Sequence, residues 1–249
     1  MIPGALDSGL AELRRQGLNL QGTVCRQTAL DLAPDLADLP QTFPSLLLVG
    51  SSGQGLWDTI VGSRSSQPHP IDSHCLGALT AFGASAGAAG VDTRLIWHGG
   101  SDRPFPVVQL GEALGWSQRS RMGIGIHPQR GLWFAYRGVV AIGQELRVDS
   151  TAPSPGLNSP CAECEGTPCV TACPVSAVGG PGGVDLRLCF DEREREGAVC
   201  GSRCLSRLAC PVGSDHRYSL AQIAHHHHHA QMPDGWRESL PVGPPEWQE

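Results

Sequence analysis

The chain has 249 residues, a formal net charge of −6 and 18 basic residues, all of them arginine. The charges are scattered along the chain, which argues against a nucleic-acid or anionic-membrane surface. No apolar run reaches the roughly 20 residues of a membrane-spanning helix, and no apolar signal segment follows Arg14 and Arg15. We therefore expect a cytoplasmic protein without a nucleic-acid or membrane partner.

The front of the chain shows mixed helical and strand patterns. Leu6, Leu10 and Leu13 form one helical stripe, and SLLLVGSS is a short apolar run typical of a buried strand. In chain order the predicted elements are a helix over 5–16, a strand over 45–52, helices from residue 56, over 75–90 and over 105–116, a strand within 91–99, and a hairpin over 121–143 with a Pro-Gln-Arg-Gly turn.

Composition changes at DSTAPSPGLNSP, residues 149–160, which has the Pro, Ser and Gly content of a linker. Eight of the ten cysteines lie beyond it, between Cys161 and Cys210. We therefore predict a domain over 1–150, a cysteine domain over 151–220, and a helix with a loose proline-rich tail over 221–249.

The cysteine spacing is Cys161-x2-Cys164-x4-Cys169-x3-Cys173-Pro, then Cys189-x10-Cys200-x3-Cys204-x5-Cys210-Pro. It resembles the two-cluster bacterial ferredoxin pattern, in which the fourth cysteine of each run binds the other cluster. This implies one [4Fe–4S] cluster on Cys161, Cys164, Cys169 and Cys210, and a second on Cys173, Cys189, Cys200 and Cys204. Both runs are longer than the strict spacing, which loop closure tolerates. The alternatives are a disulfide framework, for which the sequence signals no oxidising compartment, and structural zinc, which rarely shows two Cys-Pro endings.

A second resemblance lies in RMGIGIHPQRGLWFAYRGVV, with Ile126-His127-Pro128, Gly131, Trp133-Phe134-Ala135 and Arg137-Gly138-Val139-Val140. This run resembles the cblC-type cobalamin-processing family of vitamin B12 decyanases and dealkylases, and weaker similarity covers about the first 150 residues. The cysteine segment behind such a domain looks like that of epoxyqueuosine reductase and the corrinoid reductive dehalogenases. The resemblances imply an α+β fold: a nitroreductase-like sheet with flanking helices, plus a small bacterial-ferredoxin-like iron–sulfur domain.

The cblC resemblance also implies cofactor-binding candidates. Arg137 would help to hold the thiol cosubstrate glutathione near the cobalt, or else pair with a core carboxylate. Either Trp133 or Phe134 must face a core, and the other could line a flat apolar pocket for the corrin ring. His127 is a further candidate, although the family binds cobalamin base-off without a protein histidine on cobalt, which favours a structural role.

Together these features predict an oxidoreductase that binds cobalamin base-off and passes electrons to its cobalt, with either reductive removal of the upper ligand or reduction of Co(II) to Co(I). The electron donor would be an external ferredoxin, flavodoxin or flavoprotein, and a homodimer is possible for a nitroreductase-like domain. The alternatives are a corrinoid-dependent substrate reductase, and a non-enzymatic corrinoid chaperone or electron carrier.

Three other features are given ordinary interpretations. The tract His225 to His229 is compositional or a fortuitous metal binder, because five consecutive histidines on a helix point in several directions. VGSSGQGLW is a turn, since it lacks the full dinucleotide-binding spacing. Cys25 and Cys75 are expected to be buried structural thiols.

Overall fold

The computed structural model describes residues 4–62, 69–102, 104–148, 159–180 and 183–229. The chain divides into two compact units: unit 1 comprises Met1–Ser117 and Phe134–Leu157, and unit 2 comprises Gln118–Trp133 and Asn158–Glu249. Residues 118–133, which the sequence analysis placed in the front domain, thus group with the cysteine segment. Most of the predicted linker and the whole predicted tail lie outside the described residues. Within the described ranges, no helix is both long and apolar enough to cross a bilayer.

Unit 1 is built around a four-stranded antiparallel sheet with the strand order β1-β2-β6-β3. Its elements are α1 (Gly4–Arg15), β1 (Leu20–Cys25), α2 (Arg26–Leu32), η1 (Pro34–Asp38), β2 (Ser45–Ser52), α3 (Gly55–Gly62), α4 (Pro70–Ala88), β3 (Thr93–His98), α5 (Val107–Ala113) and β6 (Phe134–Ile142).

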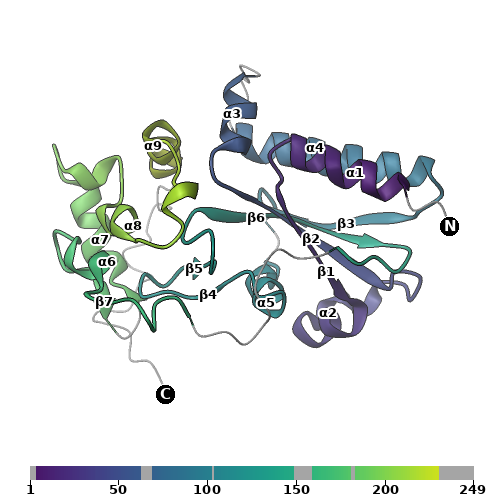
Figure 1. Ribbon diagram of the computed structural model, residues 1–249, viewed down its shortest axis with the longest axis horizontal. Coiled ribbons are helices and arrows are strands. Elements are labelled where there is room, and N and C mark those ends of the chain that lie inside the picture. The colour runs from purple at the N-terminus through teal and green to yellow at the C-terminus, as the bar shows by residue number, and fades with distance from the viewer. Residues whose placement is uncertain (1–3, 63–68, 103, 149–158, 181–182, 230–249) are drawn as a thin grey trace. The chain divides into compact units, whose positions relative to one another are not determined.

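Helices cover both faces of this sheet (Figure 1). Strand β2 is buried throughout because it is central, and its apolar residues face both ways: Leu47 and Val49 face the core with α1, α3 and α4, whereas Leu46 and Leu48 face the core with α2 and α5. Because successive side chains of a strand point to opposite faces, the residues of β2 contribute to the hydrophobic core on each side of the sheet. The predicted strand over 45–52 is confirmed.

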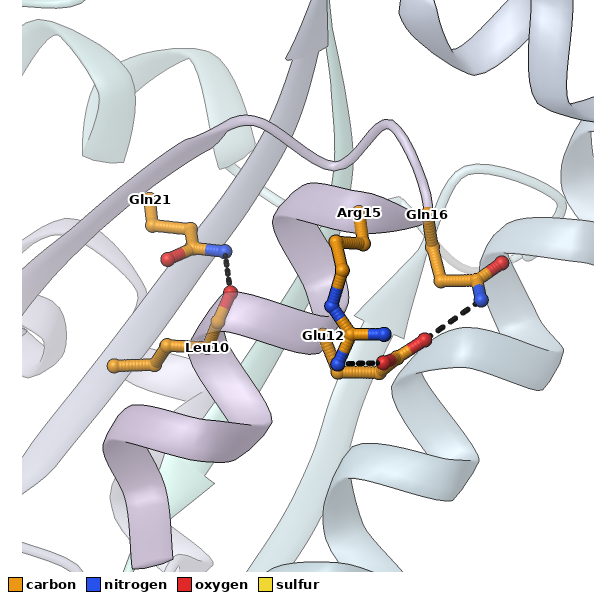
Figure 2. Close-up of polar contacts among 5 residues, drawn as sticks. All are labelled: Leu10, Glu12, Arg15, Gln16 and Gln21. Atoms are coloured by element: carbon orange, nitrogen blue, oxygen red, sulfur yellow. Dashed lines mark hydrogen bonds and ion pairs between the residues drawn. The ribbon is translucent and has the colours of Figure 1, made fainter. Parts of the chain in front are cut away.

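Polar contacts tie α1 to the sheet and to itself (Figure 2). The buried amide of Gln21 on β1 donates its Nε2 hydrogen to the Leu10 carbonyl at 2.9 Å. On the exposed side, Glu12 accepts from Gln16 Nε2 at 2.7 Å and pairs with Arg15. The helix thus has an inner face anchored to β1 and an outer face with the Glu12–Arg15 ion pair and a hydrogen bond from Gln16.

Unit 2 holds shorter elements. These are β4 (Gln118–Arg119), β5 (Gly125–Ile126), α6 (Pro168–Thr171), β7 (Val178–Gly180), β8 (Gly183–Val184), α7 (Leu186–Glu194), η2 (Val199–Gly201), α8 (Leu205–Ala209), η3 (Ser214–His216) and α9 (Leu220–His229). Strand β4 pairs with β5 and β7 with β8, each as a two-stranded antiparallel sheet.

The predicted hairpin over 121–143 is wrong. Its first strand, β5, pairs with β4 in unit 2, whereas β6 pairs with β2 and β3 in unit 1. Of the predicted hairpin, the structure contains only the turn, which is closed by a β-bridge between His127 and Gly131. The run of apolar residues on both sides of a turn predicted the strands correctly but not their partners.

Candidate metal centres and cofactor site

The eight cysteines of unit 2 are all free thiols, and each is buried or half-buried. Short elements hold them: Cys169 lies in α6, Cys189 in α7, Cys200 in η2, and Cys204 caps the start of α8. Cys161 and Cys164 lie in the turns before α6, and Cys173 and Cys210 follow α6 and α8. The frequent changes of direction in this segment let distant cysteines approach one another.

One set of neighbouring thiols contains Cys161, Cys164, Cys169 and Cys210. Burial raises the pKa of Cys169, and the charges of Cys161 and Cys164 raise it further. Burial also raises the pKa of Cys210, with added contributions from Cys161, Cys169 and Cys164. This set has the same members as the first predicted cluster.

The other set contains Cys173, Cys189, Cys200 and Cys204. Burial raises the pKa of Cys189 to about 11, and Cys204, Cys173 and Cys200 raise it as well, against a lowering by Arg193. Burial raises the pKa of Cys200, followed by the charges of Cys204, Glu192 and Cys173. Its members are those of the second predicted cluster.

These two sets fit iron–sulfur clusters chemically. Thiols that raise one another's pKa cannot all ionise unless a bound cation offsets their charge, and a coordinated metal does so. Two sulfurs also accept backbone hydrogen bonds, Cys173 from Ala177 N at 3.2 Å and Cys204 from Arg207 N at 3.4 Å, a contact that tunes cluster potentials.

Within the described ranges, no group of three or more His, Cys, Asp or Glu side chains is close enough to hold a single metal ion. Thiolates around one zinc ion lie about 2.3 Å from it, a tighter arrangement than that around a four-iron cluster. Cluster binding by the eight cysteines therefore stays a prediction, drawn from spacing and from the two neighbour sets.

An apolar shell packs against five of the eight thiols. Met122, Ile126, Leu132 and Val178 are buried in one hydrophobic cluster with Cys169 and Cys210, and Cys161, Cys173 and Cys204 pack against it. Three of these apolar residues come from the segment 118–133. This role could not be predicted from the sequence, because the cysteine spacing carries no information on which distant segment covers the thiols.

His127 holds the turn at the end of that segment. Its ring is fully buried, and Nδ1 accepts the backbone N–H groups of Gln129 at 3.1 Å and Arg130 at 3.2 Å. Burial, followed by the charges of Arg130 and His216, lowers the pKa of His127 to about 4. The ring is therefore a neutral part of the core of unit 2, and the geometry gives it a structural role in place of a cofactor contact.

Trp133 is also fully buried, in a cluster with Tyr218 and Ile223. Its ring meets Tyr218 edge to face at 5.4 Å, and the Arg207 guanidinium lies 4.6 Å from the ring centroid. Of the two candidates Trp133 and Phe134, Trp133 is thus the core residue. Its side chain has no exposed surface that could contact a corrin ring.

Phe134 and Arg137 belong to β6 in unit 1. Phe134 is half-buried and meets Tyr136 edge to face at 5.5 Å. Arg137 is 9% exposed, and its Nε donates to Ser51 Oγ on β2 at 3.0 Å. Among the described residues, no carboxylate lies within ion-pair distance of Arg137. The alternative of an arginine paired with a core carboxylate is therefore not what this part of the chain shows.

The residue after Arg137 is a glycine for a steric reason. A Cβ at this position would lie 2.3 Å from Leu79 Cδ1 on α4. The missing side chain lets α4 pack directly against β6, which also brings Cys75 on α4 near Arg137. Burial raises the pKa of Cys75 to about 11, while the charge of Arg137 lowers it. Cys75 is buried as expected, but the expectation for Cys25 is wrong, because Cys25 is exposed at the start of α2.

A cavity of about 580 Å³ in unit 1 lies elsewhere, between α1 and α4. Glu12, Gln16, Ser73 and His74 are among its polar lining residues. None of the four predicted cofactor residues lines it. The cavity therefore adds nothing to the corrinoid interpretation.

In unit 2, the histidine tract falls on α9. The backbone carbonyl of His227 accepts from Arg193 at 2.7 Å, and the ring of His226 packs against Tyr218. These contacts are structural, and among the described residues no metal-ligating group of three forms there.

The fold and the thiols together define a mixed α/β protein with a small antiparallel sheet, flanking helices and a thiol-rich second unit. No protein-family model and no curated protein sequence matches the chain. Several solved structures are similar to the chain. Selenomethionine-labelled epoxyqueuosine reductase has a TM-score of 0.52 and 12% identity, covering 86% of this chain and 67% of that one. A reductive dehalogenase described for B12-dependent dehalogenation has a TM-score of 0.50 and 16% identity, covering 90% and 33%.

Two further solved structures are similar to the chain. Epoxyqueuosine reductase with an epoxyqueuosine-modified tRNA-Tyr stem loop has a TM-score of 0.51 and 12% identity, covering 88% of this chain and 68% of that one. The CblC B12-trafficking protein of C. elegans has a TM-score of 0.46 and 15% identity, covering 90% and 92%. Because one similar structure contains RNA, the expectation of no nucleic-acid partner gains no support. At these identities, the likeness to the structures with TM-scores of 0.50 or more is a likeness of fold alone.

Proposed function

We propose that this chain binds two [4Fe–4S] clusters and base-off cobalamin, and that it passes electrons through the clusters to the cobalt. The observation that carries the proposal is the grouping of eight thiols into two sets of four. The fold likeness to epoxyqueuosine reductase and to a B12-dependent dehalogenase supports it.

The cysteines of unit 2 hold the clusters, and the apolar shell limits the access of water to them. A [4Fe–4S] cluster supplies one-electron transfer at potentials that reach about −700 mV, low enough for cobalt reduction. The N–H groups of Ala177 and Arg207 stabilise negative charge on the sulfurs of Cys173 and Cys204. An external ferredoxin, flavodoxin or flavoprotein is the proposed donor.

Arg137 is the proposed binding residue of unit 1. Burial of a guanidinium without a carboxylate partner is costly, and a carboxylate or amide oxygen of a ligand offsets that cost. Ser51 fixes the guanidinium plane through Nε, which leaves the two terminal nitrogens for a ligand. Phe134, three residues earlier on β6, packs with the α2 and α5 core on the other face of the sheet, so the proposal does not use it. In this proposal cobalamin is the substrate, and its upper ligand leaves on reduction.

A second candidate is a reductase that uses cobalamin as its catalyst. The TM-scores of 0.52 for epoxyqueuosine reductase and 0.50 for the dehalogenase favour it, because both are named for reactions on other substrates. The two candidates share the cofactors and differ in turnover. If cyanocobalamin is converted to a reduced, decyanated product, the first candidate is supported. If the bound cobalamin is reduced and then returns to its original spectrum each time that it is oxidised, the second is supported.

The first test is elemental analysis of protein purified without oxygen. We expect about eight iron atoms per chain, as two four-iron clusters require, and little zinc. Addition of cyanocobalamin and a strong reductant should then give a base-off spectrum followed by cobalt reduction. Colourless protein rich in zinc would rule out the proposal.

Two matched pairs of variants separate the units. Arg137→Gln should weaken cobalamin binding about tenfold or more while leaving the iron content unchanged, and Arg94→Gln, an exposed arginine on β3, should change neither. Cys164→Ala should lose about half of the iron and keep cobalamin binding, and Cys25→Ala, at an exposed thiol outside both sets, should keep both. Equal loss of cobalamin by the Arg137 and Cys164 variants would contradict the division of roles.

A further inference from the structure

The cavity between α1 and α4 of unit 1 has no role in the proposed function. The two helices run antiparallel: His74, near the start of α4, contacts the Gln16 carbonyl just past the end of α1, whereas Phe82, further along α4, lies against Gly9. A Cβ at Gly9 would lie 2.9 Å from the Phe82 ring, so the absent side chain lets the helices approach closely there. The cavity, of about 580 Å³, lies beside this contact.

The cavity exists because small residues line it on the α4 side. They are exposed and recur at four-residue intervals, which places them along one face of the helix: Ser73, Gly77, Ala81 and Ser85. The buried residues that line the cavity include Leu13 and Phe82, which give it an apolar floor. Its volume and its apolar floor with a few polar groups are those of a small-molecule site.

Glu12 is the charged residue of the lining. One of its oxygens accepts from Gln16 Nε2 at 2.7 Å, and the other pairs with Arg15 (Figure 2). A carboxylate has about four acceptor sites, so these two contacts leave capacity for a further donor. Arg15 is a weak competitor, because its side chain is 72% exposed and ion pairs of this kind contribute little. Glu12 can therefore bind a ligand cation.

The other polar groups of the lining are also acceptors. Ser8 donates its hydroxyl hydrogen to the Gly4 carbonyl at 2.9 Å, which leaves its oxygen lone pairs. His74 Nε2 lies 3.0 Å from the Gln16 carbonyl, which can only accept, so Nε2 carries the hydrogen and Nδ1 of the neutral ring is an acceptor. The described residues that line the cavity include one carboxylate and no arginine, and the chain has no lysine. The lining thus favours a positively charged donor.

We propose that this cavity binds a small organic amine, with its ammonium group on Glu12 and its apolar body on the floor formed by Leu13 and Phe82. An ammonium group donates three hydrogen bonds and accepts none, which matches the acceptors of the lining. A carboxylate or phosphate ligand is disfavoured, since it would meet the charge of Glu12 without a cation among the described lining residues. The inference depends on neither the clusters nor cobalamin, because none of the four predicted cofactor residues lines this cavity.

The experiment is isothermal titration calorimetry of the full chain, purified anaerobically, at pH 8, where an unperturbed imidazole is neutral. Three probes share an indole ring and differ in charge: tryptamine carries an ammonium group, tryptophol a hydroxyl and indole-3-acetate a carboxylate. Tryptamine should bind one site with a dissociation constant of about 1 mM or below, the order that a ligand of its size reaches. Tryptophol should bind at least about fivefold more weakly, and indole-3-acetate should not bind. Equal affinity for the three probes, or no binding of tryptamine, would overturn the inference.

Variants test whether tryptamine binds in this cavity. Glu12→Gln should remove the preference for tryptamine over tryptophol. Gly77→Leu should abolish binding, because a Cβ at Gly77 has no atom within 4 Å and a leucine there occupies the open space that Gly77 lines. Gly87→Leu is the matched control, since Gly87 has equally open surroundings on the same helix but does not line the cavity; it should bind tryptamine like the unmodified chain. If Gly77→Leu fails to fold, Glu12→Gln decides the outcome. Unchanged tryptamine affinity in Gly77→Leu, or an unchanged preference in Glu12→Gln, would contradict the assignment and leave the proposed function standing.

Discussion

Replacement of Gly131 by alanine tests the packing of unit 2 most directly. Gly131 has φ +60°, in the left-handed region, and closes the turn by exchanging backbone hydrogen bonds with His127. A Cβ there would lie 1.9 Å from the Val212 carbonyl oxygen and 2.7 Å from its carbon. Val212 follows Cys210 by two residues, so the turn packs on the backbone that carries a proposed cluster ligand.

The magnitude has two parts. An alanine in the left-handed conformation costs about 1–2 kcal/mol. The steric part is larger, because the obstacle is a backbone carbonyl that must move by roughly 1 Å, and overpacking of this kind costs up to about 3 kcal/mol. Gly197→Ala isolates the first part, since Gly197 has φ +73° and no atom within 4 Å of the added Cβ.

The assay is thermal unfolding of both variants beside the unmodified protein, with iron content measured on each sample. A steric cost of about 3 kcal/mol should lower the melting temperature of Gly131→Ala by about 6–12 °C beyond that of Gly197→Ala. Gly131→Ala should also release iron at lower temperature. Equal melting temperatures for the two variants would mean that the turn does not pack against Val212.

Three further predictions concern the cores and the thiols. The pKa of His127 is lowered from 6.5 to about 4 in the folded protein, so this residue contributes stability that is present above about pH 6.5 and is lost as the pH falls toward 4. His127→Asn keeps a hydrogen-bond acceptor for the turn but cannot titrate, and it should therefore lose less stability between these pH values in acid unfolding curves. Gly138→Ala should lower the free energy of unfolding of unit 1 by about 1–3 kcal/mol in denaturant titrations. In a Leu79→Ala background, where the clash is removed, the same change should cost much less. Additive costs of the two substitutions would mean that Gly138 and Leu79 are not in contact. Iodoacetamide should modify the exposed Cys25 before the buried Cys75 in peptide mass spectra, and early labelling of Cys75 would refute its burial.

Much of unit 1 could be predicted from local patterns. The strand over 45–52 was recognisable because both of its faces are buried, which makes the run apolar without interruption. The helices observed as α1, α3, α4 and α5 were each expected, with α4 starting earlier, at Pro70. Strand β1, LQGTVC, was missed, since its polar residues conceal the pattern even though Gln21 is buried through its hydrogen bonds to α1 and to Leu18.

The site could be predicted only in part. The cysteine spacing predicts two clusters of four ligands each, and the thiols that shift the pKa of Cys169, Cys189, Cys200 and Cys210 fall within the same two sets, but cluster binding stays a prediction. The neighbours of these thiols could not be found in the same way: Met122, Ile126 and Leu132, which share a hydrophobic cluster with Cys169 and Cys210, belong to a segment that precedes the predicted linker. The hairpin error has the same origin, since a strand pattern does not identify the strand's partner.

The division of the chain between Trp133 and Phe134 has a practical consequence. The run Ile126 to Val140 begins in one unit and ends in the other, so the two units are discontinuous along the sequence. A fragment that stops near residue 150 would retain Trp133 and Leu132 without Tyr218, Arg207 and the other residues that bury them. Neither half can therefore be expressed, exchanged or grafted onto another scaffold by a single cut. A fragment of unit 1 alone needs a short bridge from Ser117 to Phe134 in place of the excised segment.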